Sequence, residues 1–298
     1  MTYVLYNPLS DNRNGEANTK KIKEILTADD LKFIDITSID LADYFAGASA
    51  HDRIVIAGGD GTINYMVNKL GGKIPEFPIL YFPIGSGNDF RREFEDKADS
   101  DLITLNPYIE NLPTVTINGK STLFLNGVGF GIDGYCCEEG DKLRSKSPDP
   151  INYTSIAIKG MLFHFKPRNA KITVDGKLYE YKAVWIAPTM NGKYYGGGMK
   201  VAPDQDRMNP EGKVSVVVMH HPNKIKTLMV FPKIFKGKHI ENKNMVEVLT
   251  GNEITATFDK PTPLQIDGET VSGVESYTVI SKPRIKKEAA TEAESLKV

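Results

Sequence analysis

RIVIAGGDGTINYMVNKL, residues 53–70, decides the fold of this chain, because an apolar run leads directly into a glycine loop and then into an amphipathic segment. Residues 53–57 read as a strand that is buried on both faces. After the loop, apolar side chains recur at the spacing of one helix face, at Ile63, Met66, Val67 and Leu70. The stretch therefore predicts a strand, a turn at residues 58–62 and a helix that starts near Thr62.

The loop itself has the composition of a phosphate site. Glycine at positions 58, 59 and 61 lets the backbone approach a bulky anion, and the start of a helix offers free N–H groups with a partial positive charge. An acidic side chain in such a loop would repel phosphate unless it acts through a cation, so Asp60 predicts Mg²⁺. The alternative is a glycine-rich turn that binds no ligand.

A second glycine loop follows the next predicted strand, in ILYFPIGSGNDFRREF, residues 79–94. Both loops leave the carboxyl ends of strands that we expect to be parallel, which is where open α/β sheets bind ligands. We therefore expect Asp89 to join Asp60 at the metal and Arg91 or Arg92 to reach phosphate. The alternative is that Ser86 and Asp89 cap a turn and the arginines are solvated.

A third candidate lies far along the chain, in PLQIDGETV, residues 263–271. Asp267 and Glu269 project to the same side if this segment is extended. One carboxylate could accept the proton of an attacking hydroxyl while the other tunes it or binds metal. If Asp267 is the base, Asp267→Asn should slow the reaction with little effect on folding. The alternative is a β-turn with an acidic rim.

The pattern of the chain changes near residue 113, which predicts two domains. The first part alternates strands (2–6, 31–36, 53–57 and 78–82) with helices (16–26, 41–45 and 62–70), as in a mostly parallel sheet covered by helices. The second part has short β-rich runs with turns at Asn118-Gly119 and Asp175-Gly176, as in antiparallel sheets. We expect an α/β domain at 1–118, with the chain end at about 280–288 as a candidate addition to it. We expect a β-rich domain at 119–279 and a disordered tail at 287–298.

Composition narrows the classes of partner. The 298 residues include 37 basic and 38 acidic side chains, so no global field would recruit nucleic acid. The N-terminus lacks the pattern of a signal peptide, no segment approaches the length of a membrane span, and the cysteines are adjacent, which together favour a reduced, intracellular protein.

One segment, Lys224–Ile240, mixes apolar residues with lysines. It is a candidate for contact with anionic lipid, and the alternative is a solvated face over a packed helix.

Together these stretches resemble the diacylglycerol kinase catalytic family, which includes bacterial lipid kinases and the sphingosine and ceramide kinases. Similar motifs run through nearly the whole chain, namely Asn7-Pro8, GGDGT (58–62), GSGNDF (85–90), FLNGVGFGID (124–133), NGKYYGGGMKVAP (191–203) and IDGE (266–269). GGDGT alone also resembles NAD kinases and phosphofructokinases, but its succession with GSGNDF and IDGE is more discriminating.

The resemblance implies an NAD-kinase-like α/β domain followed by a β-sandwich-like domain, with ATP in the cleft between them. It implies Mg²⁺ at Asp60 and Asp89. It implies Asp267 as general base, with Glu269 and Asp60 beside it. The implied nucleotide contacts are Asn7, Gly58, Gly59, Asp60, Gly61, Thr62, Gly85, Ser86 and Asn88. The implied activity is phosphorylation of a lipid hydroxyl, most simply of diacylglycerol to phosphatidic acid, by a cytoplasmic protein at the inner membrane surface. A homodimer is a further implied partner.

The sequence departs from the family in two places. Thr116 stands where an aspartate is common, with Asp133 as a candidate replacement, and Asn209 and Glu211 stand in a turn that is often rich in aspartate and binds a structural Mg²⁺. Two other functions stay open. One is an NAD kinase-like enzyme for a small molecule, and the other is a catalytically silent nucleotide sensor.

Overall fold

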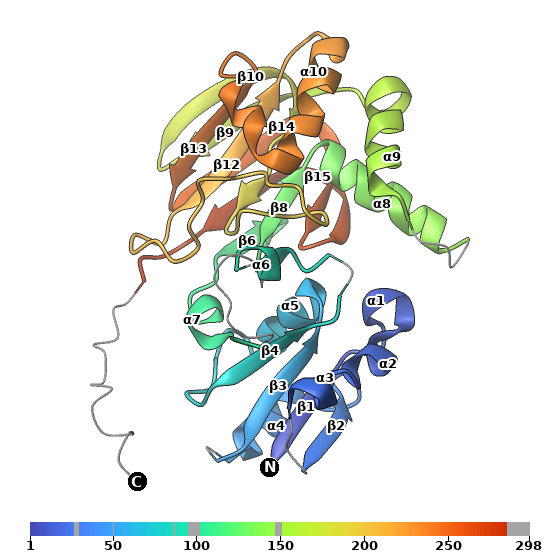
Figure 1. Cartoon of the computed structure of the whole chain (residues 1–298). Coiled ribbons are helices and arrows are strands. Elements are labelled where there is room, and N and C mark those ends of the chain that lie inside the picture. The colour runs from blue at the N-terminus through green and yellow to red at the C-terminus, as the bar shows by residue number, and fades with distance from the viewer. Residues whose placement is uncertain (27–29, 50, 86, 95–101, 147–150, 285–298) are drawn as a thin grey trace.

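The computed structural model describes residues 1–26, 30–49, 51–85, 87–94, 102–146 and 151–284. Figure 1 shows two parts, an α/β part that carries the N-terminus and a larger part built mainly of strands. This mixed architecture confirms the predicted fold class, with a mostly parallel sheet followed by a second, β-rich domain. No helix among the described residues is long and apolar enough to cross a bilayer.

The first sheet has the strand order β2-β1-β3-β4-β5. Strands β1 (Thr2–Tyr6), β2 (Leu31–Asp35), β3 (Arg53–Gly58) and β4 (Ile79–Pro83) are parallel, and β5 (Ile103–Thr104) is antiparallel to β4. Seven helices connect or cover them within the described residues, namely α1 (Ser10–Arg13), α2 (Gly15–Thr19), α3 (Ile22–Ile25), α4 (Leu41–Gly47), α5 (Asp60–Lys69), α6 (Asp89–Arg92) and α7 (Asn106–Ile109).

Strand β3 explains why its apolar run is continuous. Ile54 and Ile56 belong to the hydrophobic cluster formed with α4 and α5, whereas Val55 and Ala57 belong to the cluster formed with α3. Successive side chains of a strand point to opposite faces, so a strand covered on both faces is apolar at every position. The predicted buried strand is therefore confirmed.

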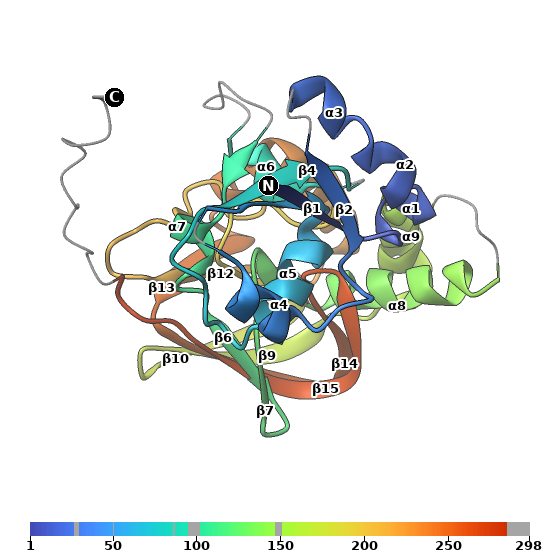
Figure 2. The ribbon, with the colours of Figure 1, turned by 90° about the horizontal axis from the view of Figure 1, so that it is seen from below.

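The second sheet is antiparallel and closes on itself. Its order is β7-β6-β15-β14-β8-β11-β12-β10-β9, β13 pairs with β12, and an additional pairing of β14 with β9 completes a ring that Figure 2 shows from below. The strands are β6 (Thr114–Ile117), β7 (Lys120–Leu123), β8 (Gly127–Phe130), β9 (Arg168–Val174), β10 (Lys177–Ile186), β11 (Thr189–Met190), β12 (Val214–His220), β13 (Val246–Gly251), β14 (Glu253–Ile266) and β15 (Glu269–Ile280).

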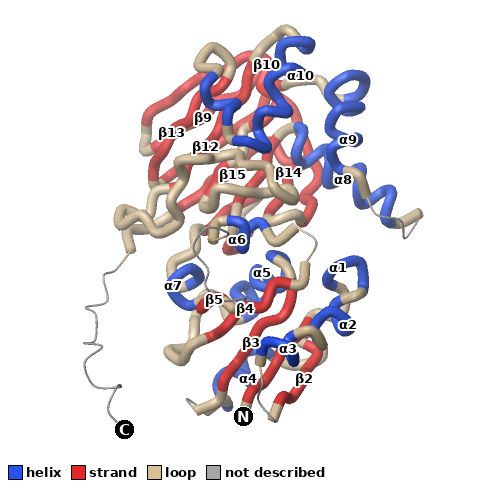
Figure 3. Tube along the Cα trace, viewed as in Figure 1, coloured by secondary structure: helices blue, strands red, loops and turns tan. Residues whose placement is uncertain are grey.

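Helical segments of the second domain pack against this sheet, as Figure 3 shows in blue. They are α8 (Ile132–Arg144), α9 (Tyr153–Lys159), the π-helical turn η1 (Gly160–His164), α10 (Lys224–Val230), and the 3₁₀ turns η2 (Phe231–Lys236) and η3 (Lys238–Glu241). The expected break at Pro232 is present, because the α-helix ends at Val230 and the proline lies in the first turn of η2.

Three expectations about the elements require correction. The helix expected at 16–26 is broken into α2 and α3, and α5 begins at Asp60, two residues earlier than expected. Strand β6 pairs with β15 in the second sheet, so Thr114–Ile117 does not belong to the α/β domain in which the boundary at residue 118 placed it.

At the chain end, the Arg284 guanidinium donates to the carbonyls of Arg207 and Pro107 and so contacts both domains. The tail predicted at 287–298 lies outside the described residues.

Candidate active site

The two glycine loops at the ends of β3 and β4 are in direct backbone contact. A Cβ atom placed on Gly85 would lie 2.5 Å from the Cα of Gly59, and one placed on Gly59 would lie 3.1 Å from the Cα of Gly85. No larger residue fits at position 85 unless the opposite backbone moves. The predicted convergence of the two loops is therefore present in the structure, and it explains the need for glycine at both positions.

Asp60 joins these loops to each other. Its carboxylate accepts hydrogen bonds from the backbone N–H of Asp89 at 2.7 Å and of Phe90 at 2.9 Å, so it caps the start of α6. Burial raises the pKa of Asp60, and the two N–H donors oppose that rise. Asp60 thus has a structural role at the N-terminus of α6, in addition to any role with a cation.

Polar side chains fix the shape of both loops. Asn88, which has a left-handed backbone with φ of 48°, donates to the carbonyl of Gly85 at 2.6 Å and accepts from its N–H at 3.1 Å. Thr62 is buried under Gly58, and its hydroxyl lies 3.3 Å from the amide nitrogen of Asn7. Asn7 and Thr62, which were predicted to contact a nucleotide together, are thus neighbours. Ser86 lies outside the described residues.

Asp89 connects the second glycine loop to the β-rich domain. Its carboxylate accepts from the N–H of Gly197 at 2.8 Å and of Gly198 at 2.7 Å. Burial, with the nearby charge of Asp60, raises the pKa of Asp89 to about 6. The side chain of Arg92 is 37% exposed, and its Nε donates to the carbonyl of Gly87 and lies 4.0 Å from the carboxylate of Asp89.

Asp267 lies in the two-residue turn between β14 and β15 and points toward the α/β domain. Asp267 and Gly268 both have positive φ, as the turn of a tight hairpin requires. One carboxylate oxygen accepts from the side-chain amide of Asn64 on α5 at 2.7 Å and from the N–H of Leu125 at 2.5 Å. The other accepts from the N–H of Asn126 at 2.8 Å and of Gly127 at 3.0 Å. Burial raises the pKa of Asp267 despite these four donors.

The pairing of Asp267 with Glu269 requires correction. It was expected on the condition that the segment is extended, but Asp267 occupies a turn and Glu269 is the first residue of β15, where its side chain is exposed. The two carboxylates therefore face different surroundings. The catalytic role of Glu269 remains a prediction without support from the geometry.

Asn126 lies between Asp267 and the glycine loop, and sequence analysis assigned no role to this residue. Its backbone N–H donates to Asp267, and its side chain lies close enough to the carboxylate of Asp60 to lower the pKa of that group. It is only 3% exposed. One asparagine thus joins two of the predicted site carboxylates, which are contributed by different domains and lie 207 positions apart in the chain. The only sequence signal was its place in the FLNGVGFGID motif.

Arg207 is the second site residue that sequence reasoning missed. Its guanidinium is buried, pairs with both carboxylate oxygens of Glu93 at 2.8 and 2.6 Å, and donates to the side chain of Asn126 at 2.9 Å. It also lies 4.7 Å from the ring centre of Phe90. Because Glu93 follows α6 and Arg207 belongs to the second domain, this ion pair connects the two domains beside the site.

The residues present fit Mg²⁺ only when phosphate and water supply most of its ligands. No group of three or more His, Cys, Asp or Glu side chains in the described ranges forms a metal cage, and both oxygens of Asp60 and of Asp89 already accept an N–H bond. The two carboxylates nevertheless flank one position, since a Cβ placed on Gly87 would lie 3.8 Å from an oxygen of each. Magnesium commonly binds proteins in this way, through one or two carboxylates, waters and substrate phosphates.

Thr116 and Asp133, the two positions considered for a further acidic group, both lie apart from the carboxylates of Asp60, Asp89 and Asp267. Thr116 is on β6, where its hydroxyl pairs with that of Ser121. Asp133, at the start of α8, is buried near Tyr195 and Gln265, and one atom of each of these three side chains has no hydrogen-bond partner among the described residues. A Cβ on Gly129 would lie 2.6 Å from the amide nitrogen of Gln265 and 2.9 Å from a carboxylate oxygen of Asp133, so these two groups are neighbours.

Asp133 makes the stability of the protein depend on pH. Burial raises the pKa of Asp133 from 3.8 to about 7, although the nearby Tyr195 hydroxyl limits the rise. The folded state therefore holds this proton more tightly than the unfolded state, and its stability falls as pH rises from about 4 to 7. The advantage of Asp133→Asn over the wild type should grow by ~2–3 kcal/mol between pH 5 and pH 8 in urea unfolding. The exposed Asp204→Asn variant is the control, and equal pH profiles for all three proteins would contradict the assignment.

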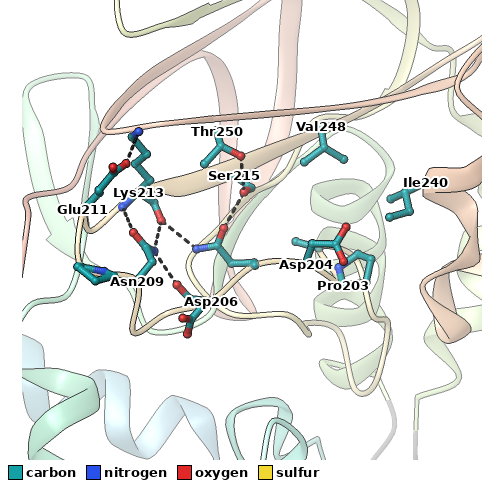
Figure 4. Close-up of a pocket in the computed structure, with 13 residues that line it drawn as sticks. Pro203, Asp204, Asp206, Asn209, Glu211, Lys213, Ser215, Ile240, Val248 and Thr250 are labelled. Atoms are coloured by element: carbon teal, nitrogen blue, oxygen red, sulfur yellow. Dashed lines mark hydrogen bonds and ion pairs between the residues drawn. The ribbon is translucent and has the colours of Figure 1, made fainter.

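The turn with Asn209 and Glu211, which departs from the aspartate-rich turn of the family, borders a separate hollow of about 460 Å³ (Figure 4). The side-chain amide of Asn209 donates to the carbonyls of Asp206 at 2.6 Å and Lys213 at 2.9 Å, and Gln205 also donates to Lys213. Glu211 pairs with the ammonium group of Lys213. N–H donors thus satisfy two carbonyls inside the turn.

Two glycine loops at the end of a parallel sheet, facing a carboxylate from a second, β-rich domain, define a two-domain kinase of the NAD-kinase-like type. The family model described as diacylglycerol kinase catalytic domain matches residues 1–112, and the one described as YegS C-terminal NAD kinase beta sandwich-like domain matches residues 126–285. The chain belongs to the diacylglycerol kinase family of lipid kinases.

Curated relatives support this family. The chain is 27% identical over 204 residues to a diacylglycerol kinase of Mycobacterium tuberculosis. The aligned region covers 66% of this chain and 64% of the relative. It is 27% identical over 224 residues to a diacylglycerol kinase of Bacillus subtilis, and that aligned region covers 73% of this chain and 71% of the relative. The match thus spans slightly less than two thirds of the mycobacterial enzyme.

A solved structure shares the fold. A crystal structure of a diacylglycerol kinase from Bacillus anthracis aligns with a TM-score of 0.57 and 17% identity, and the alignment covers 94% of each chain. At this identity the likeness shows the arrangement of the two domains and no more.

Proposed function

We propose that this protein transfers the γ-phosphoryl group of ATP to the hydroxyl of a membrane lipid, and that diacylglycerol is the acceptor and phosphatidic acid the product. The observation that carries the proposal is the position of Asn126, whose backbone N–H donates to Asp267 and whose side chain lies close enough to Asp60 to lower the pKa of that carboxylate. It joins the loop that would hold the triphosphate to the carboxylate that would accept the hydroxyl proton. The names of the relatives support the class of acceptor.

The start of α5 is the proposed site for the phosphates. Gly61 is exposed, and a Cβ atom placed on it would meet nothing within 4 Å, so the surface at the helix start is open to a ligand. The helix runs for ten residues, and its first N–H groups favour an anion. The other nucleotide contacts of this proposal are Asn7, Gly58, Gly59, Thr62, Gly85, Ser86 and Asn88. One guanidinium nitrogen of Arg91 is buried without a hydrogen-bond partner among the described residues, and we propose it as a further donor beside the second loop.

Asp267 is the proposed general base. Its raised pKa favours acceptance of a proton from the attacking hydroxyl, and its four N–H donors hold the carboxylate in one orientation. Mg²⁺ held near Asp60 and Asp89 would neutralise charge on the phosphates. Most of the rate enhancement would then come from positioning and electrostatic stabilisation, as is general for phosphoryl transfer. The lipid acceptor places the protein, in this proposal, in the cytoplasm at the inner membrane surface.

Transfer from γ-labelled ATP tests this function. The wild-type protein is incubated with diacylglycerol in detergent micelles, with Mg²⁺ or with EDTA, and label is expected in phosphatidic acid only with Mg²⁺. Label in NAD supplied instead of lipid would support an NAD kinase-like enzyme. Binding of ATP without transfer to either acceptor would support a catalytically silent sensor. Either result contradicts the proposal.

A further inference from the structure

Two helical segments of the second domain carry apolar side chains on their outer as well as their inner faces. On the inner side, Met161 and Phe165 from the first segment and Phe231 and Ile234 from the second are buried in one hydrophobic cluster. A surface helix that packs only against a core has an apolar stripe and a polar opposite face. The outer faces of α9–η1 (153–164) and α10–η2 (224–236), which we call the platform, do not follow that rule.

The outer side chains of the platform are large and exposed. Of the thirteen large apolar residues exposed among the described residues, six lie here, so these side chains form a patch instead of the scattered exposure that is normal for a protein surface. Phe163, Ile225 and Met229 are the most exposed, at 75%, 69% and 63%. The other three are Ile158, Leu162 and Phe235.

The two segments of the platform form one surface. A hollow of about 280 Å³ lies between them, and only apolar residues line it, namely Ile158, Leu162, Leu228, Phe231, Pro232 and Phe235. The ammonium group of Lys224 donates to the carbonyl of Leu162 at 2.8 Å and so ties α10 to the end of η1. In Figure 1, α10 lies at the top of the second domain and α9 lies along its right-hand edge.

The two segments of the platform and their flanking residues carry charge of a single sign. Residues 151–166 and 220–240 contain seven lysines and no aspartate or glutamate, although the whole chain has almost equal numbers of basic and acidic residues. The side chains of Lys226, Lys233 and Lys236 are exposed. Apolar side chains bordered by lysines match the boundary between acyl chains and anionic head groups, where the long lysine side chains can reach the phosphates.

We propose that the platform docks the protein onto a bilayer that contains anionic lipid, with Phe163, Ile225 and Met229 inserted among the acyl chains. The charge complementarity selects a membrane over an apolar protein partner. The inference deepens the proposed function, because it rests on a membrane lipid being the acceptor and names the surface through which the protein would reach it. Only half of this surface was expected from the sequence, since the lysine-rich segment was singled out but α9–η1 was not.

Co-sedimentation with vesicles tests the platform without nucleotide. The full chain is mixed with vesicles of phosphatidylcholine alone or with about one third phosphatidylglycerol, and binding should be much stronger with the anionic lipid. The triple variant Lys226→Glu, Lys233→Glu and Lys236→Glu should bind anionic vesicles roughly 100-fold more weakly. Phe163→Ser combined with Ile225→Ser should also weaken binding, by about tenfold or more.

The matched control reverses three exposed lysines elsewhere, in the variant Lys120→Glu, Lys182→Glu and Lys260→Glu. This variant has the same net charge as the platform triple and should retain most of the binding. All substituted side chains are exposed, and circular dichroism checks that every variant is folded. No binding by the wild type, or equal losses in the two triple variants, would overturn the proposal. If the wild type phosphorylates diacylglycerol in micelles but fails to bind vesicles, the platform is wrong and the kinase assignment stands.

Discussion

Asparagine in place of Asp267 is expected to lower phosphoryl transfer by roughly 10²- to 10⁴-fold, the usual contribution of a general base. An amide cannot accept the hydroxyl proton. Neither of the other two predicted catalytic carboxylates is placed to replace Asp267, because Glu269 is exposed on the neighbouring strand and Asp60 is bonded to the start of α6. The loss should appear in kcat, since the phosphate loop itself is unchanged.

The structure changes one part of this expectation. From the sequence, Asp267→Asn was expected to fold normally, but the carboxylate accepts four N–H bonds, three of them from the backbone of residues 125–127. The amide of asparagine turns one acceptor into a donor that faces other donors. At least one buried N–H group then lacks a partner, at a cost of about 1–3 kcal/mol. We therefore expect a less stable variant as well as a slow one.

The two effects can be separated experimentally. Transfer is measured at a temperature where circular dichroism shows that the variant is folded, and ATP binding is followed through the rise in melting temperature that it causes. Glu275→Gln, an exposed change on the same hairpin, serves as control and should match the wild type in both assays. Near-normal turnover by Asp267→Asn would remove Asp267 from the role of base. A folded variant that no longer binds ATP would show that the residue only shapes the pocket.

The parts of the site that the sequence predicted depend on local geometry. A strand, a glycine turn and a helix follow one another within eighteen residues of RIVIAGGDGTINYMVNKL, and the requirement for glycine arises from backbone contact at Gly59 and Gly85. Asp267-Gly268 also had a local signal, and the β-turn that was left open as the alternative at this site is the one the structure has. An Asp-Gly pair between apolar runs is typical of a tight hairpin turn, and such a turn separates the direction of Asp267 from that of Glu269.

The residues that join the domains had no such signal. Glu93 and Arg207 are 114 positions apart, and in a sequence each has the appearance of a solvated surface charge. Asn126 offered only a place in a motif. Pairing between distant side chains depends on how the second sheet is set against the first, and neither apolar periodicity nor turn residues report on that. The chemistry of the loops could thus be predicted, whereas the contacts that hold the loops together could not.

Removal of Glu93 should have the largest effect on stability. Glu93→Ala leaves the buried guanidinium of Arg207 without its carboxylate partner, and breaking a buried pair in this way typically costs 3–5 kcal/mol. Glu93 also accepts the backbone N–H of Lys193, so a second buried donor loses its partner. Urea unfolding of the variant measures the cost. Glu76→Ala, which removes an exposed carboxylate from the same domain, should change stability by less than about 0.5 kcal/mol.

Combining Glu93→Ala with Arg207→Met distinguishes an uncompensated charge from simple loss of packing. If the unpaired guanidinium dominates the cost, removing it as well should make the double variant more stable than Glu93→Ala alone. Recovery should be partial, because Arg207 also donates to the side chain of Asn126 and the carbonyl of Leu125. Additive losses would mean that the pair acts only through packing. An exposed ion pair contributes no more than about 1 kcal/mol. A smaller cost for Glu93→Ala would therefore mean that water reaches the Glu93–Arg207 pair. The pair would then not hold the two domains together.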